Sequence, residues 1–401
     1  MLLIVPIAVI TGASVALFLW LMELAQNLRW NNLWLITGLP AAGILIAWMY
    51  KTAGGNLAAG NDLLIEEIHV PKNGVSKWLA PLIFITTLIT HVFGGSAGRE
   101  GTAVQMGGGI AGAFLHRFRP DKHQISVLLS CGMAAGFGAV FGTPFAGALF
   151  AIEVLTRGRL KYRISGPCLF AALIAHGTVM LTGAQHTTYQ VLFVPGSDGV
   201  FRWLPGEISL AGKVLAAGVI FGCTSRLYVL VSDNVRSGAT RLVSSPVLRP
   251  AIGGLLIILI GLVPGNLDYL GLGVSNPNPG GVSILSAFKP GGAETFSWFW
   301  KLLLTAITLG FGFKGGEVTP LFFIGATLAN IIAVPLAAPV DLLAAAGFLA
   351  VFAGATKTPV ACTVMGIELF GIDNFIFFAI ACFVSSFCSG KNGIYAAQRK
   401  G

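Results

Sequence analysis

Charged residues are scarce in this sequence. Of its 401 residues, 10% are Asp, Glu, Lys or Arg, whereas a soluble domain carries about a quarter. Hydrophobic residues make up 55%, and the mean hydropathy is +0.81. So little polar material cannot cover a water-facing surface, which excludes a soluble enzyme, a nucleic-acid-binding protein and a disordered scaffold. The composition predicts an integral membrane protein.

The sequence also lacks the patterns that bind metals or cofactors. Its six cysteines show no CxxC or Cys/His spacing, and no Ser/His/Asp set or Walker motif occurs. We therefore expect buried free cysteines, no metal, no cofactor and no enzymatic activity. The stretch Gly107–Gly112 satisfies G-x-G-x-x-G but lies in an apolar run without a preceding strand, so it predicts close helix packing and not dinucleotide binding.

Basic residues account for the net charge of +9, and they gather in short connections between apolar runs. By the positive-inside rule we place these connections and the C-terminus in the cytoplasm, in a multi-pass protein of a bacterial inner or plasma membrane. The alternative interpretation is that the positive charge of these residues attracts anions. The basic residues concerned are Arg117, Arg119, Lys122, Arg157, Arg159, Lys161, Arg163, Arg226, Arg236, Arg241, Arg249, Arg399 and Lys400.

Apolar runs predict an all-α protein with helices of two kinds. Long runs occur at about 2–22, 33–50, 78–94, 164–182, 208–232, 250–263, 298–311 and 374–388. Shorter, glycine-interrupted runs occur at about 101–115, 124–134, 137–156, 319–338, 342–356 and 358–371. The first run is too long for a signal peptide and predicts a membrane helix. Because broken helices are tolerated at membrane depth only where protein buries them or a cavity adjoins them, the short runs predict the functional interior.

The two halves of the sequence share motifs at nearly one offset. Gly98-Arg99-Glu100-Gly101-Thr102 matches Gly315-Gly316-Glu317-Val318-Thr319 as G-x-E-x-T. Thr143-Pro144 leading to Glu153 matches Thr358-Pro359 leading to Glu368, and Phe137 and Phe352 precede the two Thr-Pro pairs by the same spacing. We therefore predict a single transmembrane domain, residues 1–401, made of two repeats at about 1–190 and 205–401, with no soluble regulatory domain. Glu153 and Glu368 recur in both halves, and two roles stay open for them: a shared structural role, such as pairing near a helix end, and transport.

Duplicated halves with broken helices in corresponding positions indicate a transport site where the repeats meet. The N-termini of half-helices offer free N–H groups and the positive end of the helix dipole. Such a site suits an anion. Glu100, in a glycine-rich loop that opens a short helix, would compete with that anion while ionised and leave when protonated. The alternative is that Glu100 caps its helix or pairs with Arg99.

The stretch Gly98-Arg99-Glu100-Gly101 resembles the glutamate-gate motif of the CLC family of chloride channels and proton-coupled anion antiporters. The resemblance covers nearly the whole chain and implies an inverted-repeat helical fold with many tilted, broken and partly spanning helices. It also implies a homodimer with one anion pathway in each subunit. By resemblance, Glu100 is the gating and proton glutamate, Tyr395 contacts the central anion, and Gly98, Arg99, Gly101 and Val318 adjoin it.

Departures from the family pattern narrow this resemblance. Thr102 replaces the usual proline after the gate motif, and Asn61 stands where chloride-handling members commonly have serine. The usual family motif G-x-F-x-P reads Gly316-Glu317-Val318-Thr319-Pro320 here. The position of the inner proton glutamate of chloride/proton exchangers is occupied by Val154. Together, Asn61 and Glu317–Pro320 are similar to the CLC-F branch of fluoride/proton antiporters. Glu317 then becomes the predicted second proton station.

The chemistry of fluoride fits these departures. Fluoride is small and strongly hydrated, so its binding requires close N–H and O–H donors, which Asn61, Thr319 and Tyr395 would supply. The predicted function is exchange of fluoride for protons, and the alternative is a chloride channel or chloride/proton antiporter of the same fold. Individual residues keep structural alternatives: a helix cap for Asn61 and Thr319, a salt bridge to Lys314 for Glu317, and a core or interfacial position for Tyr395.

Overall fold

The structure is a computed structural model and describes residues 2–54, 56–72, 74–118, 121–157, 160–196 and 205–399. Within these ranges helices dominate, and the extended pairing is limited to two isolated bridges, Gly98 with Gly316 and Thr156 with Arg399. The predicted all-α architecture is confirmed. Arg119, Arg159 and Lys400, which contribute to the predicted cytoplasmic charge, lie outside the described residues.

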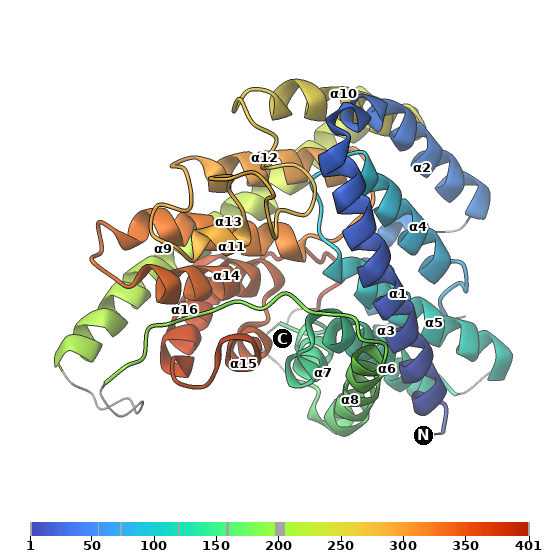
Figure 1. Cartoon of the computed structure of the whole chain (residues 1–401). Coiled ribbons are helices and arrows are strands. Elements are labelled where there is room, and N and C mark those ends of the chain that lie inside the picture. The colour runs from blue at the N-terminus through green and yellow to red at the C-terminus, as the bar shows by residue number, and fades with distance from the viewer. Residues whose placement is uncertain are drawn as a thin grey trace.

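Sixteen α-helices occur in the described part of the chain, together with three short 3₁₀ helices (Figure 1). The first half contains α1 (Ile4–Asn31), α2 (Leu39–Ala53), α3 (Asn61–His69), α4 (Leu79–Val92), α5 (Glu100–Phe118), α6 (Lys122–Phe141), α7 (Pro144–Glu153) and α8 (Ser165–Leu181). The second half contains α9 (Pro205–Leu242), α10 (Arg249–Gly261), α11 (Ile284–Ala287), α12 (Ser297–Gly310), α13 (Val318–Ala333), α14 (Val340–Thr356), α15 (Pro359–Phe370) and α16 (Phe375–Cys388).

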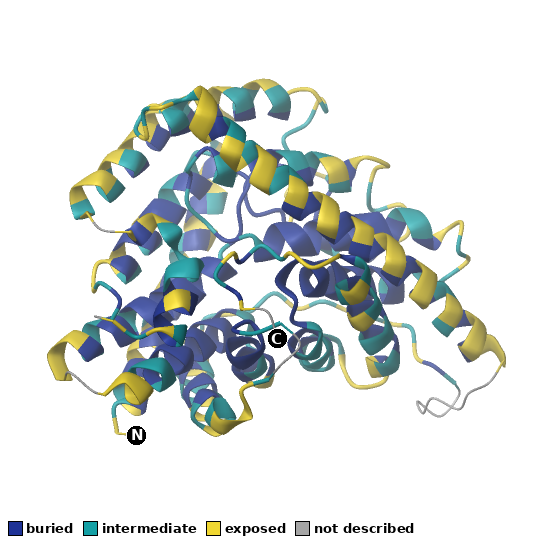
Figure 2. Ribbon diagram, turned by 180° about the vertical axis from the view of Figure 1, so that it is seen from behind, coloured by how far each residue is buried: buried dark blue, intermediate teal, exposed yellow. Residues whose placement is uncertain are grey.

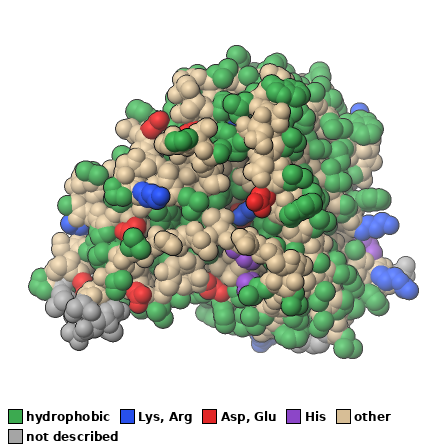
Figure 3. All heavy atoms as spheres, in the orientation of Figure 1, with side chains coloured by type: hydrophobic (Ala, Val, Ile, Leu, Met, Phe, Trp, Pro, Cys, Tyr) green, Lys and Arg blue, Asp and Glu red, His purple; other side chains and the backbone are tan. Residues whose placement is uncertain are grey.

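The helices differ widely in length, as the apolar runs predicted. Five helical segments in the described part are long and apolar enough to cross a membrane: Ile4–Asn31, Leu33–Ala53, Lys122–Phe141, Tyr162–Leu181 and Pro205–Leu242. The others are shorter, and several lie deep in the molecule (Figure 2). Hydrophobic side chains spread over the face drawn in Figure 3, where charged side chains are few. The chain is an all-helical membrane protein.

One predicted boundary is wrong. The runs at 124–134 and 137–156 were expected to be separate, but α6 continues through Gly136 and ends at Phe141. Glycine does not break the helix here, because Gly132 and Gly136 face the backbone of α5 and allow the two helices to approach closely. The break falls at Gly142, which has a left-handed conformation, and Pro144 then starts α7.

Glycines join the central helix pair in each half. A Cβ on Gly107 of α5 would lie 1.9 Å from the carbonyl oxygen of Gly132 in α6. In the second half, a Cβ on Gly325 of α13 would lie 2.0 Å from the carbonyl oxygen of Gly347 in α14. The glycine motif at 107–112 is thus a packing motif, as predicted, and the same contact recurs in both halves.

Two carboxylates connect the halves reciprocally. Glu153, the last residue of α7, accepts hydrogen bonds from Val360 N (3.0 Å) and Ala361 N (2.7 Å) in the first turn of α15. Glu368 of α15 accepts from Phe145 N (3.0 Å) and Ala146 N (2.7 Å) in the first turn of α7. Each carboxylate satisfies two N–H groups that have no partner within their own helix. The shared structural role predicted for this pair is confirmed, and the two-repeat division remains a prediction that these contacts support.

Aromatic rings fill the space between the halves. Phe137 and Phe352, the duplicated phenylalanines, stack with ring centroids 6.4 Å apart, and Phe150 lies 4.5 Å from Phe137 and 6.0 Å from Phe352. Phe322 of α13 stacks on Phe348 of α14. Such contacts add to the burial of the rings, so this cluster forms the centre of the core.

All six cysteines are free. Cys131, Cys168, Cys362 and Cys382 are buried as expected, but Cys223 is exposed and Cys388 is partly exposed. The expectation of burial is therefore wrong for these two, since Cys223 lies on an outer face of α9, where the surrounding side chains are apolar and exposed.

Replacing Gly107 by Ala should destabilise the fold, because the added methyl group overlaps the Gly132 carbonyl. Overpacking of this kind costs about 1–3 kcal/mol. We expect a lower unfolding temperature in detergent than for the unmodified protein. Gly212→Ala is the matched control, because Gly212 lies in α9 with nothing within 4 Å of an added Cβ. Equal unfolding temperatures for the two variants would contradict the proposed packing role.

Candidate functional site

Two helices begin at one point in the centre of the molecule. Gly98 N donates to Gly316 O, and Gly316 N donates to Gly98 O, each at 2.6 Å. This pairing places the starts of α5 and α13 beside each other. A Cβ on Gly316 would lie 2.7 Å from Gly101 N, and one on Gly98 would lie 2.8 Å from Thr319 Oγ1. Both positions therefore require glycine for the close approach of the two backbones.

The Glu100 carboxylate lies between these helix starts and is 3% exposed. Its Oε2 accepts hydrogen bonds from Thr319 N and Arg99 N, both at 3.2 Å, and from Thr319 Oγ1. Arg99 Nε lies 3.5 Å from the other carboxylate oxygen. The pairing with Arg99, which was the structural alternative, is thus present, and Thr319 of α13, in the other half, donates to the same carboxylate twice. The carboxylate occupies the place that an anion would take at two helix N-termini.

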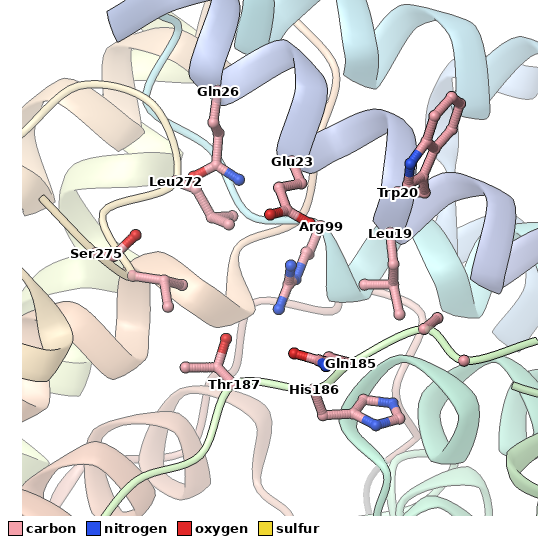
Figure 4. Close-up of a pocket in the computed structure, with 13 residues that line it drawn as sticks. Leu19, Trp20, Glu23, Gln26, Arg99, Gln185, His186, Thr187, Leu272 and Ser275 are labelled. Carbon is pink, nitrogen blue, oxygen red and sulfur yellow. The ribbon is translucent and has the colours of Figure 1, made fainter. Parts of the chain in front are cut away.

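A cavity of about 450 Å³, here called the Arg99 cavity, opens on one side of Glu100. Figure 4 shows Arg99 pointing into it, with Glu23 of α1 on one side and Gln185 and Thr187 on the other. Polar side chains dominate the part of the wall drawn there, and the Arg99 Nε atom is buried without a hydrogen bond. An arginine held in this way presents a positive charge to the cavity.

A second cavity of about 450 Å³, the Tyr395 cavity, adjoins the start of α13. It brings together three of the predicted residues, Asn61, Glu317 and Tyr395, from segments far apart in sequence. Gly315 and Gly316 also line it, whereas Glu100 lines neither cavity. Its neighbour in the chain, Arg99, lines the Arg99 cavity, and Glu317, two residues before its hydrogen-bond partner Thr319, lines the Tyr395 cavity.

Asn61 is not a helix cap. The cap of α3 is Gly60, with φ +58°, and Asn61 is the first helical residue, with no side-chain capping bond. Its Nδ2 atom is 3.5 Å from where a Cβ on Gly101 would stand, and its Oδ1 is buried without a partner. The amide is thus directed at the start of α5 and has hydrogen-bonding capacity to spare.

Glu317 lies on the cavity wall without the salt bridge that was one alternative for it. Lys314 Nζ donates instead to Ala58 O (3.3 Å) and lies 4.5 Å from the centre of the Tyr50 ring. Within the described residues no ion pair joins Lys314 to Glu317. The salt-bridge alternative is wrong, because the lysine side chain turns towards α2 and the segment before α3.

Thr319 also differs from its structural alternative. Glu317 is the cap of α13, so Thr319 is the second helical residue and uses its hydroxyl to bind Glu100. Val318, the first residue of α13, is 1% exposed, and Tyr395 is 5% exposed. Tyr395 is both a buried tyrosine and part of the cavity wall, so its two interpretations coexist.

Asp62 is a site residue that sequence reasoning missed. Its Oδ1 accepts a hydrogen bond from Ala397 N at 3.0 Å, which holds the segment that carries Tyr395 against the start of α3. Arg236 and Arg249 of the cavity wall were likewise read only as charge in loops, and Lys314 only as a partner of Glu317. No local sequence pattern predicts that these side chains line the cavity, because their positions depend on contacts between distant segments.

Val154, at the position that the resemblance gives to the inner proton glutamate, directly follows the last residue of α7 and is fully buried. Within the described residues no group of three or more His, Cys, Asp or Glu side chains is placed to hold a metal ion. Glu100, Arg99 and Glu317 are ionisable groups at the helix starts, and such groups suit anion binding and proton transfer.

Comparison with known proteins gives consistent results. The chain is 42% identical, over 98% of its length and 85% of the relative's, to a Pseudomonas syringae pv. tomato protein named chloride/fluoride channel protein. It is 26% identical to the voltage-gated ClC-type chloride channel ClcB of Citrobacter koseri, over 76% of this chain and 71% of that one.

Two solved structures share the architecture. A CLC-type fluoride/proton antiporter superposes with a TM-score of 0.91 at 33% identity, covering 100% of this chain and 97% of that one. A slow cyanobacterial Cl⁻/H⁺ antiporter superposes with a TM-score of 0.73 at 20% identity, over 98% and 95% of the two chains, and shows the fold alone.

Residues 38–390 match the family described as voltage gated chloride channel. This match covers all but the ends of the chain and includes both helix starts, Asn61 and Glu317. The chain is therefore a member of the voltage-gated chloride channel (CLC) family.

Proposed function

We propose that this protein is a secondary-active antiporter that exchanges fluoride for protons. The observation that carries the proposal is the Glu100 carboxylate, held between two helix N-termini where Arg99 lines one cavity and Glu317 lines another. A similar protein is named chloride/fluoride channel protein, and a similar structure is that of a fluoride/proton antiporter, which supports the choice of fluoride.

The donors around Glu100 explain how protons and an anion exchange at one place. Ionised Glu100 satisfies Thr319 N and the Thr319 hydroxyl, so it excludes another anion. Protonation removes the negative charge and weakens these bonds, because hydrogen bonds to charged groups are the strong ones. The neutral side chain can then leave, and an anion takes the same donors. Proton binding and anion binding are coupled because they compete for one position.

Glu317 supplies a proton site on the Tyr395 cavity side in this mechanism. It lines that cavity, and Val154 cannot carry a proton at the position where the resemblance places the usual inner acid. Asn61 and Tyr395 line the same cavity and supply N–H and O–H donors for the anion that reaches it. The backbone of Gly98, Arg99, Gly101 and Val318, with the Thr319 hydroxyl, forms the remainder of the proposed anion site.

Chloride transport by the same scaffold is the second candidate. Arg236, Arg249 and Lys314 line the Tyr395 cavity, and their charge attracts any small anion.

We further propose a homodimer of two-repeat subunits in a bacterial plasma membrane, with the Tyr395 cavity and the C-terminus on the cytoplasmic side. The basic residues of the short connections support this orientation.

Glu100→Gln should abolish proton coupling, because the amide neither carries the proton nor repels the anion. The measurement is flux in reconstituted liposomes, with a fluoride electrode and a pH-sensitive dye inside. Glu23→Gln is the control, since Glu23 lines the Arg99 cavity without binding Thr319, and it should keep coupling. Uphill proton movement driven by a fluoride gradient in Glu100→Gln would disprove the assignment.

Glu317→Gln should impair exchange while leaving the protein folded, because one proton site is lost but no salt bridge is broken. Size-exclusion elution should be unchanged, and coupled flux should fall. Glu66→Gln on α3 is the control, because Glu66 is exposed and does not line the Tyr395 cavity. Normal coupled flux in Glu317→Gln would remove Glu317 from the proton path.

Asn61→Ser should reduce the preference for fluoride over chloride. A hydrogen bond to a charged group is worth about 1.5–3 kcal/mol, so the ratio of fluoride to chloride flux should fall roughly tenfold or more. Asn32→Ser is the control, because the Asn32 amide donates to Leu28 O outside both cavities. Equal fluoride and chloride flux in the unmodified protein would leave the chloride function standing.

A further inference from the structure

Tyr228, in the C-terminal half of α9, is fully buried and takes part in none of the contacts described above. Its hydroxyl group is also buried, and it makes no hydrogen bond of ordinary geometry. A buried tyrosine hydroxyl normally has a partner, because an unpaired polar group away from water costs free energy. Tyr269 shows the usual arrangement: its hydroxyl donates to Glu294 Oε2 at 2.8 Å and lies 3.2 Å from Ser297 Oγ.

Two side chains interact with the Tyr228 hydroxyl, although neither contact reaches full hydrogen-bond geometry. One is Ser232, which follows Tyr228 by four residues on α9, so both side chains lie on one face of the helix. The other is Glu317, the cap residue of α13. The phenol of Tyr228 is therefore placed between a hydroxyl group and the carboxyl group of the proposed second proton site.

The Ser232 hydroxyl differs from the other side-chain hydroxyls of α9 that the structure describes. Thr224, Ser225 and Thr240 each donate to the carbonyl oxygen four residues earlier. This is the usual local bond of serine and threonine inside a helix. Ser232 Oγ is buried and makes no such bond. It is therefore open to exchange a hydrogen bond with Tyr228.

Charged groups of both signs act on Glu317. Arg236 and Asp233 belong to α9 and Asp62 belongs to α3, and the Tyr395 phenol interacts with the same carboxyl group. Desolvation and the two aspartates favour the neutral carboxyl group, whereas Arg236 favours the ionised one. Within the described residues none of these groups forms an ion pair with Glu317. A partner of Glu317 must therefore suit two charge states.

We propose that Tyr228 is a positioning residue that holds Glu317 in both of its protonation states. Ionised Glu317 accepts a hydrogen bond from the phenol O–H. Protonated Glu317 donates to the phenol oxygen, and the phenol turns its own O–H towards Ser232 Oγ. A hydroxyl group both donates and accepts, so this reversal needs no proton to leave Tyr228.

This arrangement keeps the partner of Glu317 apart from the anion. Tyr228 and Ser232 line neither the Arg99 cavity nor the Tyr395 cavity, whereas Glu317 lines the latter. Holding Glu317 through α9 therefore leaves the Asn61 amide free for an anion. That Glu317 takes up a proton during exchange rests on the proposed function, but the contact of its carboxyl group with Tyr228 does not.

Infrared difference spectroscopy tests the contact directly. The full-length protein in lipid is compared in acidic and alkaline buffer, and the carboxyl C=O band of Glu317 is the one that disappears in Glu317→Gln. Tyr228→Phe and Ser232→Ala should each move this band to higher frequency, because the carboxyl group loses a hydrogen bond or is bonded more weakly. An unchanged band in Tyr228→Phe would overturn the proposal. Absence of any Glu317 band would contradict the proton site of the proposed function as well.

The pH profile of exchange tests the consequence for transport. Tyr228→Phe keeps the buried ring but removes the donor to ionised Glu317, and a hydrogen bond to a charged group is the stronger kind. The Glu317-dependent step should therefore move to higher pH by about one unit, which corresponds to a roughly tenfold change in the equilibrium. A rate lowered by the same factor at every pH would indicate a merely structural role and overturn the proposal.

Tyr269→Phe is the matched control for both measurements. It removes a buried tyrosine hydroxyl that donates to a carboxylate, Glu294, and neither residue lines the Arg99 or Tyr395 cavity. The Glu317 band and the pH profile should stay as in the unmodified protein. If Tyr269→Phe moved both as far as Tyr228→Phe does, the effect would not depend on Glu317, and the proposal would be wrong.

Discussion

The two hydrogen bonds between Gly98 and Gly316 determine where everything else in the site can lie. They join backbones from opposite halves of the chain at 2.6 Å, a separation that side chains at either position would prevent. Because of this pairing, α5 and α13 begin side by side, and their unsatisfied N–H groups converge. Glu100 binds there because its carboxylate accepts hydrogen bonds from donors at both helix starts.

The same chemistry serves structure elsewhere in the molecule. Glu153 and Glu368 each bind two successive backbone N–H groups at a helix start, as Glu100 binds Thr319. The difference lies in the surroundings. Arg99, beside Glu100, lines one cavity, Glu317 lines the other, and one bond of Glu100 comes from a hydroxyl group that can rotate away, whereas Glu153 lines neither of these cavities. A carboxylate at a helix N-terminus thus becomes exchangeable only where another anion can reach it.

Local sequence motifs predict much of the candidate site. Glycine-rich stretches and duplicated acids are short-range signals, so Glu100 and the Glu153–Glu368 pair were predictable. Other features depend on distant segments. The contact of Asp62 with Ala397 spans nearly the whole chain, and the choice of Ala58 by Lys314 depends on how α2 meets the second half. Glycine also has two opposite uses, a break or a close contact, and pattern alone did not separate them in α6.

Attraction of anions and choice among anions are separate properties of this structure. Arg236, Arg249 and Lys314 line the Tyr395 cavity and act through long-range charge, which is nearly the same for fluoride and chloride. Discrimination requires forces that depend on the size of the ion, and these act only at hydrogen-bond distance. Asn61, Thr319 and Tyr395 offer such donors around one narrow position. The basic wall therefore governs how often an anion arrives, while the three donors govern which anion is dehydrated there.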